Sequence, residues 1–198
     1  RFNSWSRALI LAGYIIPKSD WSIESVTPEE GGWLSGFFAG EGCFTIHKTI
    51  TPRGNTRYEA TITISQRIDN PQPILEIIRI LGLAQEMCNL TIQGEHQKKD
   101  TAYNCNPVYT LAIRRASVIK ERWIPLFDRY HLRSKKEAEL KIFRQVIDIL
   151  DNRLRNGMFR MQYTEAEKAL LENLNEQMKE IHKYHKPEND ISFRKDGK

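Results

Sequence analysis

The sequence has few cysteines and no long apolar stretch. Among its 198 residues are only three cysteines, Cys43, Cys88 and Cys105, which are widely spaced and form no C-x-x-C pair. An odd number of unpaired cysteines argues against a disulfide scaffold or a zinc ribbon and favours a reducing compartment. No apolar run approaches the ~18–20 residues that a membrane span requires, and the first residues lack the apolar core of a secretory signal. We therefore expect an intracellular protein with no membrane partner.

Several common enzyme signatures are also missing. The sequence contains no G-x-x-x-x-G-K-[ST] phosphate loop and no readable Cys–His catalytic pair, and its five histidines lack the spacing of an HNH nuclease. The pair His182 and His185 has the spacing of two metal ligands but no evident third one, so we interpret it as a solvated helix end. These absences give no reason to expect a small-molecule substrate.

The composition is that of a globular protein with a basic middle segment. Hydrophobic residues make up 40% of the chain, charged residues 28%, and the net charge is +5. Residues 31–150 carry 17 basic and 12 acidic side chains, which accounts for the whole surplus. A polyanion such as a nucleic acid would bind there, although a basic surface that only aids solubility is an open alternative.

Hydrophobic periodicity predicts an α+β fold. Polar and apolar residues alternate with a period of two over 43–50 and 57–67, which is typical of half-buried antiparallel strands. We expect further strands over 85–93 and 108–115 and helices over 33–40, 71–81, 117–130, 134–151 and 164–182, the last opened by a capping box of Thr164 and Glu167. The predicted domains are an N-terminal extension (1–30), one main domain (31–185) and a polar tail (186–198).

The segment from Leu34 to Gly42, LSGFFAGEG, is the most informative part of the sequence. Small residues recur four positions apart, so one helix face is nearly bare and allows two backbones to approach closely. A carboxylate, Glu41, stands at the helix C-terminus, where the helix dipole disfavours negative charge, so a cation is expected there. If two such helices packed together, the two carboxylates would need divalent cations between them, and Mg²⁺ suits oxygen ligands. A glycine-rich junction with a surface glutamate is the plain alternative.

This segment resembles the LAGLIDADG motif of homing endonucleases. The resemblance extends over roughly residues 31–155, through Ile64-Ser65-Gln66-Arg67, a helix ending at Leu81-Gly82, and Trp123-Ile124-Pro125-Leu126 followed by Ser134-Lys135-Lys136. It implies an αββαββα fold, here with additional C-terminal helices. It also implies a metal-dependent endonuclease that makes a staggered break in double-stranded DNA.

The resemblance implies a role for individual residues. Glu41 would bind the metal ions, with the Gly40 carbonyl as a second ligand, and Mg²⁺ would be the cofactor, with Ca²⁺ or Mn²⁺ able to occupy the same sites. Gln66 would position solvent near the attacking water. Lys136, or in a second register Lys135, would stabilise the phosphate in the transition state.

The motif occurs once in this sequence, which implies a homodimer acting on a roughly palindromic target. The predicted dimer interface comprises Leu34, Ser35, Gly36, Phe38, Ala39 and Gly40. DNA would lie on the polar face of the sheet, because a two-stranded ribbon fits the major groove. The predicted DNA-binding residues are Cys43, Thr45, His47, Thr49, Arg53, Arg57, Thr61, Thr63, Ser65, Arg67, Asn89, Thr91, Gln93, Thr110 and Arg114. Threonines that merely favour strand formation are the alternative interpretation of this face.

The biological setting follows only from the resemblance. It implies intron homing and a chloroplast or mitochondrial location, with a prokaryotic cytoplasm as the other option. Two rival functions stay open on the sequence. One is a non-cleaving nucleic-acid binder on the same scaffold, such as an intron maturase or a regulator, and the other is a structural dimer.

Overall fold

The computed structural model describes residues 21–52, 54–93, 107–133, 135–158 and 161–183. In chain order the elements are η1 (Ile23–Ser25), α2 (Pro28–Glu41), β1 (Gly42–Ile50), β2 (Thr56–Arg67), α3 (Gln72–Ile80), η2 (Gln85–Met87), β3 (Asn89–Gln93), β4 (Val108–Ile113), α4 (Ala116–Val118), the π-helical turn η3 (Ile119–Trp123), α5 (Ile124–Arg129), α6 (Lys135–Arg155) and α7 (Glu165–His182). This order confirms the predicted α+β class. None of the helices in these ranges has the length and apolarity needed to cross a membrane.

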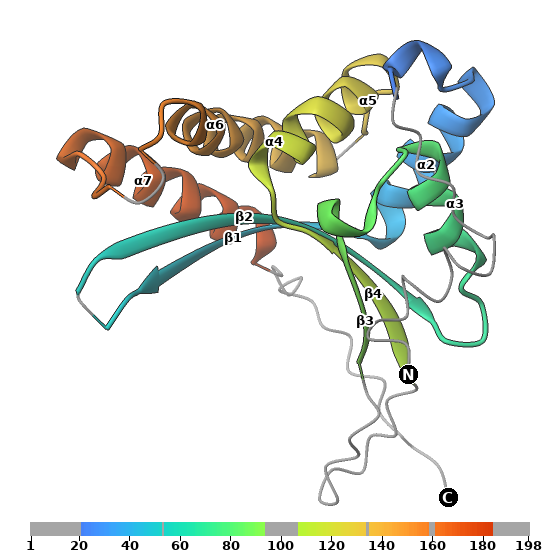
Figure 1. Ribbon diagram of the computed structural model, residues 1–198, viewed down its shortest axis with the longest axis horizontal. Coiled ribbons are helices and arrows are strands. Elements are labelled where there is room, and N and C mark those ends of the chain that lie inside the picture. The colour runs from blue at the N-terminus through green and yellow to red at the C-terminus, as the bar shows by residue number, and fades with distance from the viewer. Residues whose placement is uncertain (1–20, 53, 94–106, 134, 159–160, 184–198) are drawn as a thin grey trace, which may run out of the picture.

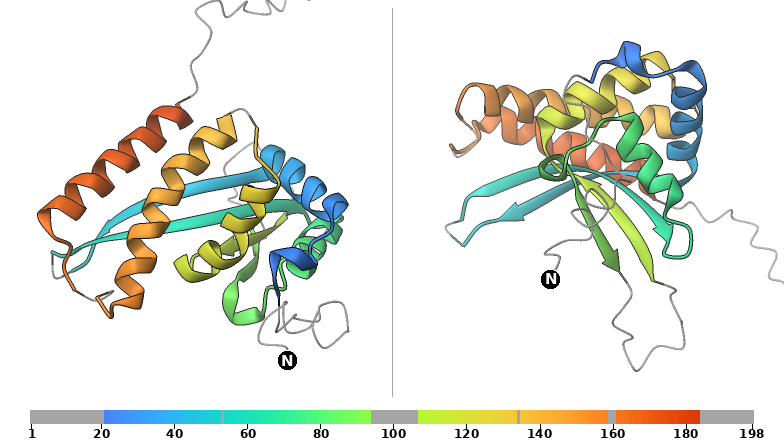
Figure 2. Two further views of the ribbon diagram at one scale, coloured as in Figure 1. Left: turned by 90° about the horizontal axis from the view of Figure 1, so that it is seen from above. Right: turned by 45° about the vertical axis from the view of Figure 1, so that its right-hand side comes forward.

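The four strands form one antiparallel sheet in the order β1-β2-β4-β3. The helices lie on one side of this sheet, and no described element covers the other side (Figures 1 and 2). The sheet arches, and its uncovered face lies on the inside of the arch (Figure 1). We call this surface the concave face.

The predicted alternation determines which strand residues face the helices. Phe44 and Ile46 of β1 and Tyr58, Ile62 and Ile64 of β2 are all buried beneath the helices. Their neighbours in sequence point to the concave face, because successive side chains of a strand point to opposite sides. The two-residue period therefore separates the core from the polar surface.

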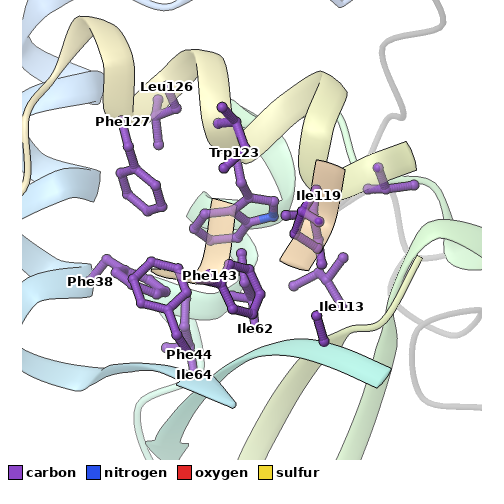
Figure 3. Close-up of a cluster of buried hydrophobic side chains, with 14 of the residues drawn as sticks. Phe38, Phe44, Ile62, Ile64, Ile113, Ile119, Trp123, Leu126, Phe127 and Phe143 are labelled. Carbon is purple, nitrogen blue, oxygen red and sulfur yellow. The ribbon is translucent and has the colours of Figure 1, made fainter. Parts of the chain in front are cut away.

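An aromatic cluster fixes α2 over the start of β1. The ring of Phe38 lies 4.8 Å from that of Phe44, 5.0 Å from Phe127 and 5.5 Å from Trp123, and Phe44 lies 4.7 Å from Phe143 (Figure 3). Burying a side chain of this size contributes roughly 1.5–3 kcal/mol, and aromatic pairs add about 0.5–1.5 kcal/mol more. The end of α2 is thus held by the same core that holds the sheet.

Helix α2 begins earlier than predicted. Thr27 and Glu30 form a complete capping box, and Pro28 occupies the first turn. The Trp21 indole N–H donates to the Ile80 carbonyl at 2.8 Å, and Val26 is buried in the core. Residues 21–30, the last part of the predicted extension over 1–30, therefore pack against the main domain, while residues 1–20 and the predicted tail over 186–198 lie outside the described residues.

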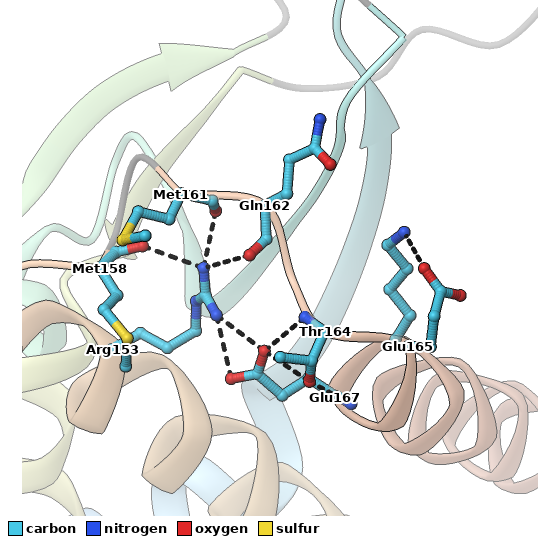
Figure 4. Close-up of polar contacts among 8 residues, drawn as sticks. Arg153, Met158, Met161, Gln162, Thr164, Glu165 and Glu167 are labelled. Carbon is cyan, nitrogen blue, oxygen red and sulfur yellow. Dashed lines mark hydrogen bonds and ion pairs between the residues drawn. The ribbon is translucent and has the colours of Figure 1, made fainter.

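Arg153 ties the turn between α6 and α7 to both helices. Its side chain is 5% exposed and donates to both carboxylate oxygens of Glu167, at 2.8 and 3.0 Å, and to the carbonyls of Met158, Met161 and Gln162 (Figure 4). Glu167 also completes the capping box with Thr164, as the sequence predicts. One guanidinium thus joins the end of α6 to the start of α7.

Candidate functional site

The glycines of α2 serve two different purposes. A Cβ atom at Gly31 would lie 2.2 Å from the Tyr130 ring, and one at Gly42, just after the helix, would lie 2.3 Å from the Phe38 ring. These two glycines are required by packing inside the chain. Nothing lies within 4 Å of a Cβ built at Gly32, Gly36 or Gly40. These three residues, four positions apart, form an open glycine stripe on the outer side of the helix.

Three residues of the predicted dimer interface lie on the inner side of α2, where the chain's own core covers them. Leu34 and Phe38 are fully buried within the chain's own core. Ser35 is also buried, and its hydroxyl donates to the Tyr130 carbonyl at 2.6 Å. These three side chains are unavailable to a second chain, because four-residue spacing repeats on every face of a helix and does not show which face is covered. Gly36, Ala39 and Gly40 are open to solvent.

Two aromatic residues beside the glycine stripe were absent from the predicted interface. Trp33 is 38% exposed, and its ring stacks on that of Phe37 with centroids 5.3 Å apart. Their i,i+4 spacing is the sequence signal that places them together. The outer side of α2 therefore combines bare backbone with exposed aromatic surface.

Glu41 is the last residue of α2 and is exposed. No ion pair or side-chain hydrogen bond joins it to any other described residue. Negative charge at a helix C-terminus is unfavourable, so this carboxylate lacks a compensating positive charge within the described part of the chain. Its position is suited to an external cation.

The donor set around Glu41 fits a divalent cation only in part. A carboxylate and the neighbouring Gly40 carbonyl are oxygen ligands of the kind that Mg²⁺ and Ca²⁺ prefer. Across the described ranges, however, no three His, Cys, Asp or Glu side chains gather closely enough to hold a metal ion. The described part of one chain therefore offers two oxygen ligands at this point, fewer than a divalent cation requires.

Gln66 lies near the same junction. The pairing of β1 with β2 begins with Gly42 opposite Ile64. Gln66, two residues further along β2, thus lies beyond the start of β1 and on the side from which α2 arrives. It is half-buried and pairs with Tyr109 of β4.

The two candidate lysines differ in their surroundings. Lys135 is exposed at the first position of α6. Lys136 is half-buried, and its ammonium lies 2.7 Å from the carboxylate of Glu139, which is only 1% exposed. His182 lies 3.6 Å from the other oxygen of that carboxylate. The sequence prediction missed Glu139, although the i,i+3 spacing from Lys136 signals such a pair.

The course of α7 relates this lysine to the start of β1. Lys48 of β1 forms an ion pair with Glu172 of α7, and the two elements run in opposite directions (Figure 1). From Glu172 to His182 the helix rises about 15 Å, close to the roughly 16 Å from Lys48 back to Cys43 along the strand. His182, and with it the first turn of α6, therefore lies toward the end of β1 that adjoins α2.

The concave face carries the predicted DNA-binding residues. Exposed or half-buried side chains on it are Cys43, Thr45, His47, Thr49, Arg57, Thr63, Ser65, Arg67, Asn89, Thr91 and, just after β4, Arg114. Thr61 and Thr110 belong to the same face but are 3% and 6% exposed. Their hydroxyls bond to Glu59 and Ser65, so these two predicted DNA-binding residues are buried within the chain and DNA binding by them stays a prediction. Arg53 and the side chain of Gln93 lie outside the described residues.

One acidic residue on the concave face was not among the predicted site residues. The side chain of Glu59 is 51% exposed and lies 3.3 Å from Nε of Arg114. Its odd position in the alternation over 57–67 is a sufficient signal for its placement. Arg67, on the same face, is bound instead by Asp69.

Comparison with known proteins gives a consistent result. A family model described as LAGLIDADG endonuclease matches residues 34–147, which is more than half of the chain. The chain is also 27% identical over 120 residues to the probable intron-encoded endonuclease Cox1-I1b of Schizosaccharomyces pombe. That match covers 61% of this chain and 27% of the relative, so the chain spans about a quarter of that protein's length.

Solved structures share the fold at low sequence identity. The homing endonuclease I-GzeII in complex with its DNA target has a TM-score of 0.55 at 20% identity, covering 78% of this chain and 44% of that one. I-CeuI, a group I intron-encoded homing endonuclease complexed with DNA, gives 0.57 at 16% identity, covering 80% and 69%. I-SmaMI bound to uncleaved DNA with calcium ions gives 0.58 at 12% identity, covering 76% and 45%. These likenesses confirm the predicted fold.

Proposed function

The chain belongs to the LAGLIDADG endonuclease family, and on that premise we propose that it is a site-specific DNA endonuclease making a staggered double-strand break. One observation carries the proposal. Glu41 is exposed and has no cationic partner among the described residues, at the point where the open glycine stripe ends and a strand of the concave face begins. A carboxylate so placed can bind a divalent cation beside DNA that lies on the sheet.

We further propose that the active unit is a homodimer. The sequence holds one copy of the motif, and the glycine stripe together with Trp33 and Phe37 provides a surface for a second copy. Exposed small residues allow two helices to approach closely, which would bring two Glu41 carboxylates together. Two-fold symmetry then implies a long and roughly palindromic target.

Glu41 and the Gly40 carbonyl are the residues proposed to hold the metal, with Mg²⁺ as the cofactor and Ca²⁺ or Mn²⁺ as substitutes. When bound, paired divalent cations stabilise the attacking and leaving oxygens of phosphodiester hydrolysis. Gln66 would orient a water molecule by hydrogen bonding. Lys136 would offset the charge that develops on the phosphate, and its ion pair with Glu139 would limit its motion.

DNA binding is proposed for the concave face. The inside of an arched sheet can accommodate a duplex, and a β-ribbon fits the ~12 Å major groove. Hydroxyl, amide and guanidinium groups on this face suit base edges and phosphates. The intron-encoded relative supports a role in intron homing, and we propose an organellar location, in a mitochondrion or chloroplast, on the same ground.

The test is cleavage of a randomised DNA library in the presence of Mg²⁺. We expect the wild-type chain to release linear products, and Glu41→Gln to abolish cutting while DNA affinity is kept. Glu29→Gln, an exposed glutamate in the first turn of α2, is the matched control and should cut normally. Binding without cleavage by the wild type would support the non-cleaving alternative, and cutting by Glu41→Gln would exclude the proposed role of that residue.

A further inference from the structure

Glu59 is the one carboxylate in the four described strands, and it lies on the concave face. A negative charge on a DNA-binding surface repels phosphates and lowers the affinity for DNA unless a neighbouring cation offsets it. The surroundings of Glu59 indicate a role in DNA recognition, which rests on the proposed function and on DNA binding to this face.

The register of the sheet brings Glu59 and Arg114 together. Ile113 pairs with Ile62, so Arg114 follows directly after β4 and lies beside Thr61. The Nε atom of Arg114 is 3.3 Å from Oε1 of Glu59, and the same oxygen accepts a hydrogen bond from the Thr61 hydroxyl at 3.3 Å. The side chains of Arg114 and Glu59 are 52% and 51% exposed, so both reach the surface of the concave face.

Glu59 approaches the Arg114 guanidinium at Nε and leaves the outer end of that group free. The closest approach is to Nε, and neither Nη atom of Arg114 donates a hydrogen bond to a described residue. Arg67 differs, because Asp69 accepts from both its Nε at 3.2 Å and its Nη2 at 2.6 Å. Asp69 therefore holds the inner edge of the Arg67 guanidinium with two hydrogen bonds, whereas Glu59 makes a single contact with that edge of Arg114.

We infer that Arg114 reads a guanine in each half-site and that Glu59 is its positioning residue. The O6 and N7 atoms of guanine form the acceptor pair that a free guanidinium end matches in the major groove. A carboxylate 3.3 Å from Nε restrains the guanidinium through an ion pair, so less side-chain freedom is lost on binding. Arg67 lies at the end of β2 and shares its charge with Asp69, so we assign it to phosphate binding.

The experiment is selection of bound duplexes from a randomised DNA library by the full chain. We expect a guanine preference of about tenfold or more at one position of each half-site for the wild type. Arg114→Ala and Arg114→Lys should both remove that preference, the lysine variant keeping the charge but not the fork. Arg67→Ala is the matched control and should weaken binding equally at all positions, with a salt slope smaller by about 1.

Glu59→Gln separates positioning from simple repulsion. Because a negative charge leaves the DNA-binding face, overall affinity should hold or rise, while the guanine preference at the Arg114 position falls several-fold. Higher affinity with an unchanged preference would overturn the positioning role, and positional preferences in Arg114→Ala equal to those of the wild type would overturn the base contact. A wild-type chain that enriches no DNA would overturn the proposed function as well.

Discussion

Replacing Arg153 by alanine should destabilise the chain by about 2–4 kcal/mol. Removing one partner of a fully buried ion pair typically costs about 3–5 kcal/mol, because the other partner stays buried without compensation. Arg153 is 5% exposed, but Glu167 is 26% exposed, so water can partly replace the lost guanidinium and the cost falls toward the lower end. Loss of the contact with the Tyr163 ring, 4.2 Å away, and of three carbonyl acceptors adds to it.

The measurement is urea and thermal unfolding of the full chain. For a protein of this length the midpoint of thermal unfolding should fall by roughly 5–15 °C, since each kcal/mol shifts it about 2–4 °C. Arg153→Lys should recover less than half of the loss, because one ammonium cannot reach both Glu167 and the carbonyls of the turn. Lys168→Ala, which breaks an ion pair with the 89%-exposed Glu165, is the control and should change stability by less than about 0.5 kcal/mol. A loss below about 1 kcal/mol in Arg153→Ala would show that the turn is held by other contacts.

Three further predictions concern the open glycine stripe, the two candidate lysines and the pH dependence of stability. Gly36→Leu, on the open stripe, should leave folding intact yet convert a dimer to a monomer in light scattering. Gly42→Ala, by contrast, should destabilise the fold, because its methyl group would contact the Phe38 ring. An unchanged dimer in Gly36→Leu would exclude the stripe as an interface. Lys136→Ala should lower the cleavage rate about 10²–10³-fold with little change in DNA affinity. Lys135→Ala and Lys141→Ala should cut at nearly the normal rate. If Lys135→Ala instead lost the cleavage and Lys136→Ala kept it, the role would belong to Lys135. The hydrogen bond from the Thr164 backbone N–H, aided by Arg153, lowers the pKa of Glu167 below its usual value near 4.5. The stability that the Glu167 carboxylate contributes is complete above that pH and is lost as the pH falls through the lowered pKa. Glu167→Gln should therefore flatten the acid limb of a stability–pH curve.

Much of the fold follows from short-range pattern in the sequence. The alternation over 43–50 and 57–67 assigned each strand residue to the core or to the concave face, because a two-residue period has only two outcomes. The capping box of Thr164 and Glu167 marked the start of α7 for a similarly local reason. The start of α2 at Pro28 could also have been predicted, since Thr27 and Glu30 show the same spacing.

The candidate site was only partly visible in the sequence. Glu41 could be identified because the helix end, the flanking glycines and the following strand are all contiguous. Glu139 was missed even though it lies only three residues from Lys136, because a single charge pair on a helix is far more often solvated than buried. Its burial depends on His182 and the end of α7, more than forty residues away.

By itself the sequence determined the elements, the two faces of the sheet and the exposed acid at the end of α2, because each depends on residues that are close along the chain. The tertiary structure alone decided which side of α2 is covered, since Tyr130 and Phe127, about ninety residues further on, pack against Ser35 and Phe38 and leave the glycine stripe open. It also decided that Glu59 meets Arg114, because strand register joins residues that no local period relates. Contacts between distant segments depend on how the elements pack, and a helical or strand period carries no information about that choice.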